Sequence, residues 1–284
     1  MKPFSLCLVC LFILAACAPS GSAPKSSTAA PGASEIQVAV AGNDFATGAP
    51  RLPLVLFAGP ERGAPAQKVS LVALDLSTDP ATQSWQGEAT PYSDYFIPYW
   101  VAYPELPQAG NWGFRANITL DDGTTAQAQF AIQVNAESSS PSVGSIPPAS
   151  KNRTLHSEPD IKKLSSDIDP NPALYQLTVA DALNSGRPAV VTFATPGYCT
   201  SQLCAPVVDS VKTVYAQYKD QVDFIHIEVY KSFDPLVYAD EMAEWGLTSE
   251  PWTFVIDRTG KIASKLVGPL SPKELTQAID PILN

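Results

Sequence analysis

Positive charge is scarce in this chain of 284 residues, which has 18 Lys and Arg against 28 Asp and Glu and a formal net charge of −10. Proteins that bind the phosphate backbone carry clustered positive charge, so this balance argues against nucleic-acid binding. Only 16% of the residues are charged and 45% are hydrophobic, which excludes a disordered tail and allows real cores. Proline is abundant, with 27 residues, and this excludes an all-helical bundle.

Long apolar runs are also lacking, apart from a short one near the N-terminus. Lys2 gives a positive start and Leu6 to Ile13 are mostly apolar, but a membrane-spanning helix needs ~20 such residues. The run therefore predicts a signal peptide over residues 1–16. Its end, Leu-Ala-Ala followed by Cys17, resembles a bacterial lipobox, in which Cys17 becomes the lipid-carrying N-terminus. The alternative is an ordinary cleaved signal with an incidental cysteine.

Residues 17–34 are small and polar, as in a flexible tether behind a lipid anchor. We therefore expect a protein that is anchored to the cell membrane by the lipid on Cys17 and faces an extracytoplasmic space. Of five cysteines, Cys7 and Cys10 leave with the signal, so only Cys199 and Cys204 keep free thiols. In a compartment that permits disulfides, two thiols five positions apart predict a redox pair.

Residues 35–135 have the texture of a β domain, with short alternating segments between turn signals. An Asp-Gly turn at 122–123 predicts a hairpin, and residues 126–134 alternate apolar and polar side chains. The pattern favours an immunoglobulin-like sandwich. Strands are expected over 36–41, 52–58, 69–76, 98–103, 112–120 and 126–134.

No catalytic constellation is visible in this domain, so we interpret it as a spacer or docking module. Its many aromatic residues between 85 and 103 either pack in a core or line a binding surface. The following residues, 136–170, include AESSSPSVGSIPPAS, with six Ser and three Pro in fifteen residues. We expect this segment to be a linker that cannot pack a core, with His156 solvated.

From residue 171 onward, strand and helix patterns alternate in the order α-β-α-β-α-β-β-α, which predicts an α/β domain over 171–284. Ser271 to Glu274 form a capping-box pattern that starts the last helix, and Pro281 is expected to end or bend it. Helices are expected over 174–184, 207–218, 236–245 and from 271 onward, and strands over 188–194, 222–229, 252–257 and 261–267.

This order resembles the thioredoxin fold, and three segments add to the resemblance. They are residues 205–209 (APVVD), 245–254 (WGLTSEPWTF) and Gly260 followed by 267–271 (VGPLS). The resemblance implies a chain of two domains, with an α/β thioredoxin-like domain behind the all-β domain. It also implies that Pro251 is cis and lies beside the active-site sulfurs. A plain strand-start proline is the alternative.

The thioredoxin motif is C-x-x-C, whereas this chain has Cys199 and Cys204 in C-x₄-C spacing. On one helix the two residues would lie ~7.5 Å apart along the axis and ~140° apart around it. A disulfide needs α-carbons within ~7 Å and converging side chains. A bond therefore requires a loop over 199–203 and a helix that begins near Cys204, with Pro206 in its first turn. There the helix macrodipole is expected to lower the pKa of Cys204.

Cys199, beside Tyr198, is expected to be the more exposed sulfur. The family assigns the attack to the first cysteine, but the sequence leaves open which one attacks. The resemblance places Thr192 where the family has a buried acid, and His226 where it has the lysine that faces this acid. A histidine there either acts as a base near the thiols or is a hydrogen-bonded core residue. We expect Glu228 to be a surface acid at the end of its strand.

Three functions follow from these observations, and the first is favoured. It is exchange of the Cys199–Cys204 dithiol or disulfide with protein thiols and disulfides outside the cytoplasm, in which Cys199, Cys204, Tyr198, His226 and Pro251 form the catalytic site. We expect no cofactor or metal for it. The second is a tethered adaptor with a structural disulfide. The third is a Cu(I) chaperone that uses both thiolates and a histidine, which the small number of histidines disfavours.

Overall fold

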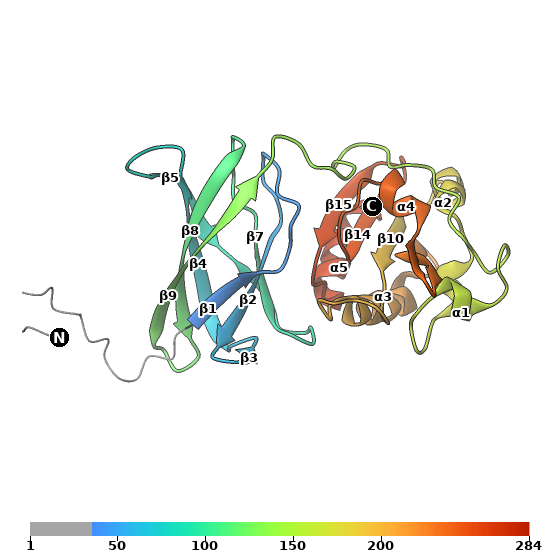
Figure 1. The fold of residues 1–284 in the computed structure, drawn as a ribbon, viewed down its shortest axis with the longest axis horizontal. Helices are drawn as coiled ribbons and strands as arrows, with labels where there is room; N and C mark the ends of the chain where they lie inside the picture. The colour runs from blue at the N-terminus through green and yellow to red at the C-terminus, as the bar shows by residue number, and fades with distance from the viewer. Residues whose placement is uncertain (1–35, 284) are drawn as a thin grey trace, which may run out of the picture. The chain divides into compact units, whose positions relative to one another are not determined.

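The first part of the chain forms two β-sheets (Figure 1). The computed structural model describes residues 36–283, so the predicted signal peptide, Cys17 and the tether lie outside the described residues. One sheet has the order β1-β2-β7-β6, with β3 paired to β2, and the other has the order β5-β4-β8-β9. The strands are β1 (Ile36–Val40), β2 (Leu52–Ala58), β3 (Glu61–Arg62), β4 (Ala66–Asp75), β5 (Thr82–Glu88), β6 (Thr90–Tyr92), β7 (Tyr99–Ala102), β8 (Gly110–Leu120) and β9 (Thr125–Val134).

The two sheets share one hydrophobic core. Leu52, Leu54 and Leu56 of β2 belong to the same buried cluster as Trp112 and Phe114 of β8. All six predicted strands are present within two or three residues of their expected bounds, and β8 and β9 form the expected hairpin. The N-terminal region is therefore rich in β-structure, as predicted. The sequence did not predict β3, β5 and β6. Strands β3 and β6 are only two and three residues long, and β5 is largely polar and exposed.

Residues 136–170 pack against the rest of the chain, so the expectation of a linker without core packing is wrong. Some of their polar side chains are buried and hydrogen-bonded: the Trp245 indole N–H donates to Ser150 Oγ over 2.8 Å. Likewise, Asn152 Oδ1 accepts from the Val179 backbone N–H over 2.8 Å. The segment also contains the short helix α1 (Ile161–Leu164). His156 is exposed, as expected.

The C-terminal sheet has the order β11-β10-β14-β15, in which β10 and β11 are parallel and the other pairs antiparallel. Helices α3 and α5 bury apolar side chains against one face, and α2 and α4 against the other. The strands are β10 (Ala189–Ala194), β11 (Asp223–Glu228), β12 (Tyr230–Phe233), β13 (Leu236–Tyr238), β14 (Trp252–Ile256) and β15 (Ile262–Val267). The helices are η1 (Pro172–Tyr175), α2 (Val179–Ser185), α3 (Cys204–Tyr218), α4 (Asp240–Glu244), α5 (Pro272–Ile279) and η2 (Asp280–Ile282).

Two predicted helices differ from the structure. The helix expected over 174–184 is split into η1 and α2, because Thr178 and Asp181 form a capping box that starts α2. The helix expected over 236–245 begins only at Asp240, since the residues before it pair with β12 as strand β13. The described residues contain no helix with the length and apolar character needed to cross a membrane.

A buried ion pair joins the β-rich region to the start of α5, and residues 36–283 belong to one compact unit. Arg51 donates two hydrogen bonds of 2.7 Å to the Glu274 carboxylate, and both side chains are nearly inaccessible. The Tyr99 hydroxyl also donates to Glu274 and accepts from the Ser271 backbone N–H. Ser271 caps α5 as predicted, but the second half of the expected capping box is absent, because Arg51 and Tyr99 hold the Glu274 carboxylate.

Candidate active site

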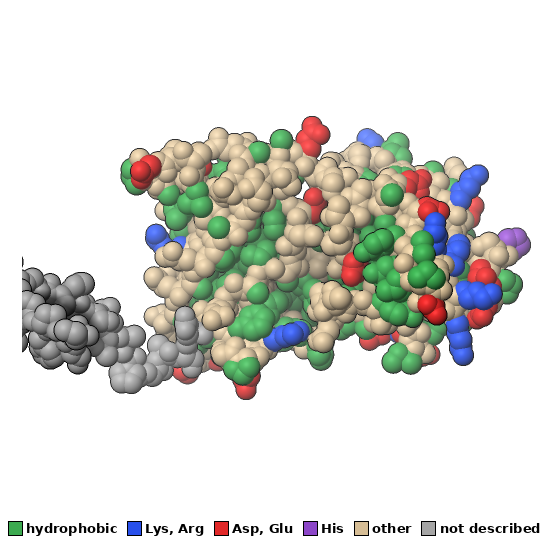
Figure 2. All heavy atoms as spheres, viewed as in Figure 1, with side chains coloured by type: hydrophobic (Ala, Val, Ile, Leu, Met, Phe, Trp, Pro, Cys, Tyr) green, Lys and Arg blue, Asp and Glu red, His purple; other side chains and the backbone are tan. Residues whose placement is uncertain are grey.

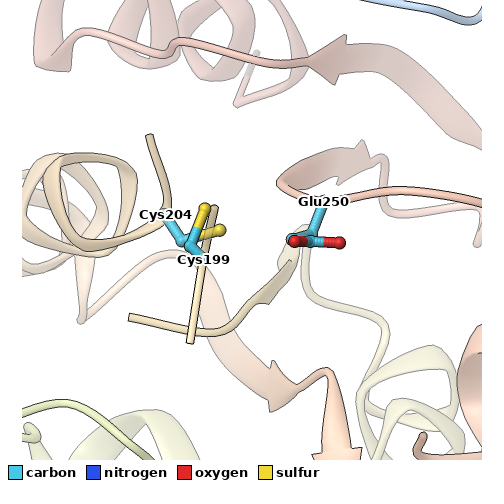
Figure 3. Close-up of side chains that lie close together, drawn as sticks. All are labelled: Cys199, Cys204 and Glu250. Atoms are coloured by element: carbon cyan, nitrogen blue, oxygen red, sulfur yellow. The ribbon is translucent and has the colours of Figure 1, made fainter. Parts of the chain in front are cut away.

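Cys199 and Cys204 lie on the loop that precedes α3 and at the first residue of that helix. As expected, 199–203 form a loop, α3 begins at Cys204, and Pro206 lies in its first turn. Gln202 has a left-handed backbone with a φ of 62°, and its N–H donates to the Cys199 carbonyl over 3.3 Å. The loop therefore turns back on itself and leaves the two Sγ atoms within 4.8 Å of each other (Figure 3). Both thiols are free.

The two thiols differ in burial and in ionisation. The pKa of Cys199 is lowered to about 5, first because the Cys204 thiol donates a hydrogen bond to it and also because Ser201 Oγ lies 3.1 Å away. Cys204 is fully buried, and this burial raises the pKa of its thiol far above the ordinary value. The expectation that the helix macrodipole lowers the pKa of Cys204 is therefore wrong, because loss of hydration outweighs it.

This asymmetry gives the two sulfurs different chemical abilities. Cys199 is half-buried and offers a thiolate, which is the nucleophilic form of cysteine. Cys204 lies behind it as a protonated thiol within reach of the same sulfur. Cys199 is thus suited to attack first, and Cys204 to close a disulfide afterwards.

The loop before β14 brings a carboxylate to this pair, from the residue that precedes Pro251. The Glu250–Pro251 peptide bond is cis, as the resemblance implied. A carboxylate oxygen of Glu250 lies within 4.8 Å of both sulfur atoms, and Figure 3 shows the side chain across from them. The pKa of Glu250 is raised by partial burial and then by the negative charges of Cys199 and Glu228. Sequence analysis missed Glu250, although its place next to Pro251 was an available signal.

Tyr198 joins an aromatic group at the surface beside Cys199. Its side chain is 40% exposed. Its ring stacks on Phe233 with 5.3 Å between ring centroids and meets Tyr230 edge-on at 6.1 Å. Both partners belong to β12, which pairs with β13 in a hairpin. The structure therefore places Tyr198 next to the reactive sulfur as part of an apolar surface.

Comparison with known proteins identifies the part of the chain that carries these residues. The model of a family described as "Thioredoxin-like domain" matches residues 175–282. Residues 175–282 are a thioredoxin-like domain. The chain is also 28% identical over 122 residues to the chloroplastic thioredoxin-like protein HCF164 of Arabidopsis thaliana, which covers 41% of this chain and 44% of that protein.

Two further matches are proteins named as thiol:disulfide interchange proteins. The thiol:disulfide interchange protein HelX of Rhodobacter capsulatus is 42% identical over 40 residues, which are 14% of this chain and 23% of that protein. A solved thiol:disulfide interchange protein of the thioredoxin family from Chlorobium tepidum aligns with a TM-score of 0.36 and 16% identity, and the match covers 50% of this chain and 99% of that one. The chain spans less than half the length of the two curated relatives.

Two polar positions inside the thioredoxin-like domain are satisfied by their own neighbours. Thr192 Oγ1 lies 3.1 Å from Thr253 Oγ1. His226 Nε2 lies 3.1 Å from the Ala194 carbonyl, which can only accept, so this nitrogen holds the proton. Nδ1 then accepts from the Tyr175 hydroxyl over 2.6 Å, and burial lowers the pKa of the imidazole.

His226 is therefore a neutral core histidine with both ring nitrogens engaged. It is not part of the group that Cys199, Cys204 and Glu250 form, and its nitrogens bind Tyr175 and Ala194, which corrects its predicted place as a base in the catalytic site. The correction also applies to the Cu(I) alternative, which needed this histidine as a ligand.

Glu228 is buried, so the expectation of a surface acid is wrong. Its Oε2 accepts from the backbone N–H and the hydroxyl of Ser166 over 2.8 and 2.7 Å. Ser166 Oγ in turn accepts from the Gly197 N–H over 2.9 Å, and a Cβ at Gly197 would lie only 3.0 Å from the Ser166 carbonyl oxygen. This chain of contacts fixes the backbone just before Cys199. Sequence analysis missed it because Ser166 fell in the predicted linker.

The β-rich region also touches the loop that carries the cysteines. The Tyr95 hydroxyl donates to the Leu203 carbonyl over 3.2 Å, directly before Cys204. Tyr92, Tyr95 and Tyr99 are buried in the same cluster as side chains of α3 and α5. Of the two interpretations of the aromatic residues, core packing therefore holds for these three.

Among residues 36–283, three side chains form a group that could hold a metal ion. They are Cys199, Cys204 and Glu250, whose donor atoms all lie within 4.8 Å of one another. Two sulfurs and one oxygen form this donor set, and no imidazole nitrogen takes part. Figure 2 shows side chains of both charge signs on the visible surface of the C-terminal domain.

Proposed function

We propose that this protein exchanges its Cys199–Cys204 dithiol or disulfide with partner proteins outside the cytoplasm. The observation that carries the proposal is the asymmetric pair itself: a half-buried thiolate and a fully buried thiol with sulfurs within 4.8 Å. Similarity to thioredoxin-like and thiol:disulfide interchange proteins supports a role of the oxidoreductase type.

The chemistry proceeds in two balanced steps. The Cys199 thiolate attacks one sulfur of a partner disulfide, and the other partner sulfur leaves as a thiolate that takes up a proton. Cys204 then loses its proton to solvent and attacks Cys199 Sγ, which breaks the mixed disulfide. The partner is reduced by two electrons, and Cys199 and Cys204 become a disulfide. The reverse sequence oxidises a partner dithiol.

The remaining parts of the proposal concern placement. A lipid on Cys17 would hold the chain at the membrane, which the Leu-Ala-Ala-Cys ending of the predicted signal peptide supports. We interpret the β-rich region as an immunoglobulin-like sandwich that serves as a spacer or docking module. Its two sheets with one shared core support that interpretation.

The redox potential of the Cys199–Cys204 pair tests the exchange. Equilibration of the purified protein with glutathione buffers should give a value in the oxidoreductase range, about −120 to −270 mV. A Cys204→Ser variant should trap mixed disulfides through Cys199, and Cys199→Ser serves as the matched control that cannot. A potential below about −300 mV without reduction of insulin would instead indicate a structural disulfide in an adaptor.

The anchor has its own test. Cells that express the full chain and receive labelled palmitate should yield labelled protein in the membrane fraction, and Cys17→Ser should abolish the label. A wild-type chain that is cleaved but carries no label would indicate an ordinary signal peptide without lipidation.

A further inference from the structure

The exchange chemistry leaves one feature of the site unused, which is the carboxylate of Glu250. It comes from the loop before β14, whereas the two sulfurs come from the loop before α3 and from its first residue. Two separate segments thus bring three metal-ligating side chains to one point (Figure 3). We propose that reduced Cys199 and Cys204 form, together with Glu250, a binding site for Zn²⁺.

The distances suit a single ion. Zinc binds sulfur at ~2.3 Å and carboxylate oxygen at ~2.0–2.2 Å, so two ligands of one tetrahedral ion lie roughly 3.3–3.8 Å apart. The three donors here are mutually within 4.8 Å, so each needs to move by no more than about 1 Å to ligate one ion.

The local charge also favours a cation. The Cys199 sulfur and a Glu250 carboxylate oxygen, both anionic as zinc ligands, lie within 4.8 Å of each other, and the buried carboxylate of Glu228 lies near enough to Glu250 to act on it. The ion pairs found within residues 36–283 involve neither Glu228 nor Glu250. Glu228 Oε1 is in addition buried without a hydrogen-bond partner in this part of the chain. A divalent ion would offset this accumulation of negative charge.

The donor set selects zinc over other metals. Cu(I) prefers soft sulfur ligands, and Mg²⁺ and Ca²⁺ prefer oxygen, whereas Zn²⁺ accepts two thiolates and a carboxylate together. Three protein ligands leave the fourth tetrahedral position for water, and both Cys199 and Glu250 are accessible to it. Zinc binding releases the Cys204 proton to solvent and transfers no electrons. Because the ligands are thiolates, the dithiol can bind zinc and the disulfide cannot.

Zinc titration of the reduced, chelator-treated full chain tests the proposal. Competition with a chromophoric chelator should show one Zn²⁺ per protein, and Co²⁺ should give a thiolate-to-cobalt charge-transfer band. The disulfide form and the Cys199→Ser variant should lose both signals. Glu250→Ala should weaken zinc binding at least tenfold, whereas Glu137→Ala, at an exposed acid outside the group, should bind like the wild type.

Several results would overturn the site. They are absence of zinc binding by the reduced wild type, equal binding by Glu250→Ala, or Cu(I) binding that ignores Glu250. Circular dichroism and the more conservative Glu250→Gln variant show whether a loss comes from misfolding, since Gln keeps the shape and weakens only the ligand. The redox potential is measured without metal, so the exchange and the zinc site can fail independently.

Discussion

Cys199 should remain a thiolate down to about pH 5, and this expectation can be tested quantitatively. An ordinary cysteine with a pKa of ~8.5 is about 0.3% ionised at pH 6, whereas a thiol with a pKa of about 5 is about 90% ionised there. The thiolate fraction at pH 6 thus differs by about 300-fold. Because nucleophilicity falls with pKa, the shape of the pH profile is the proper measure and the absolute rate is not.

The assay is alkylation of the reduced, metal-free protein by iodoacetamide between about pH 4 and 9, with Cys199 followed by peptide mass spectrometry. The rate should be half-maximal near pH 5. Since the lowered pKa favours the charged form in the folded state, the stability gained from this ionisation is complete above the ordinary thiol pKa and is lost as the pH falls through about 5. A midpoint at about pH 8 or above would refute the reasoning.

Two variants separate the causes of that shift. Cys204→Ala removes the thiol that donates to Cys199, which is the largest cause, so the midpoint should rise clearly. Ser201→Ala removes a lesser donor 3.1 Å away and should raise it less. If Cys204→Ala still titrates near pH 5, the hydrogen bond between the two thiols is not the source of the low pKa.

Three further substitutions test buried contacts of the folded chain. Arg51→Met leaves a buried carboxylate without its partner and should lower the free energy of unfolding in urea by about 3–5 kcal/mol, and a loss under about 1 kcal/mol would contradict a buried ion pair. Gly246→Ala places a Cβ 2.1 Å from a backbone oxygen, so it should cost clearly more than the ~1–2 kcal/mol of Gly186→Ala, which has the same left-handed backbone but open space. Equal thermal shifts for the two glycines would contradict this. His226→Leu removes the ring nitrogen that accepts from the buried Tyr175 hydroxyl and should cost about 1–3 kcal/mol, yet leave the alkylation midpoint of Cys199 unchanged, and a moved midpoint would restore a role at the sulfurs.

The sequence predicted the elements whose side chains follow a clear period. Strands β8 and β9 alternate around an Asp-Gly turn, and their hairpin formed as expected. Strand β5 was not predicted because its side chains are largely polar and exposed, so its pairing with β4 leaves no hydrophobic pattern in the sequence. The packing of residues 136–170 was not predicted for a related reason. Serine and asparagine can be buried when they are hydrogen-bonded, and the composition does not show their partners.

In the candidate site, covalent geometry was a better guide than electrostatics. The length of C-x₄-C forces a loop before Cys204 if the sulfurs are to meet, and that loop is present. The pKa of Cys204 could not be predicted, because burial by distant side chains decides it and the helix dipole does not. The burial of Glu228 and Glu250 could not be predicted for the same reason, since nothing in the sequence marks an acid at a strand end or before a proline as buried.

The zinc site and the disulfide compete for the same two sulfurs, and this competition has a measurable consequence. An ion that binds only the dithiol stabilises the reduced form, so it must raise the redox potential of the pair. Free Zn²⁺ at 100 times its dissociation constant multiplies the equilibrium constant for reduction by about 100, which corresponds to a rise of about 59 mV for two electrons. The same zinc should leave the potential of Glu250→Ala nearly unchanged, because that variant keeps both sulfurs and lacks the third ligand. A redox potential of the wild type that does not change with zinc would mean that the Glu250 carboxylate beside the sulfurs is not part of a zinc site.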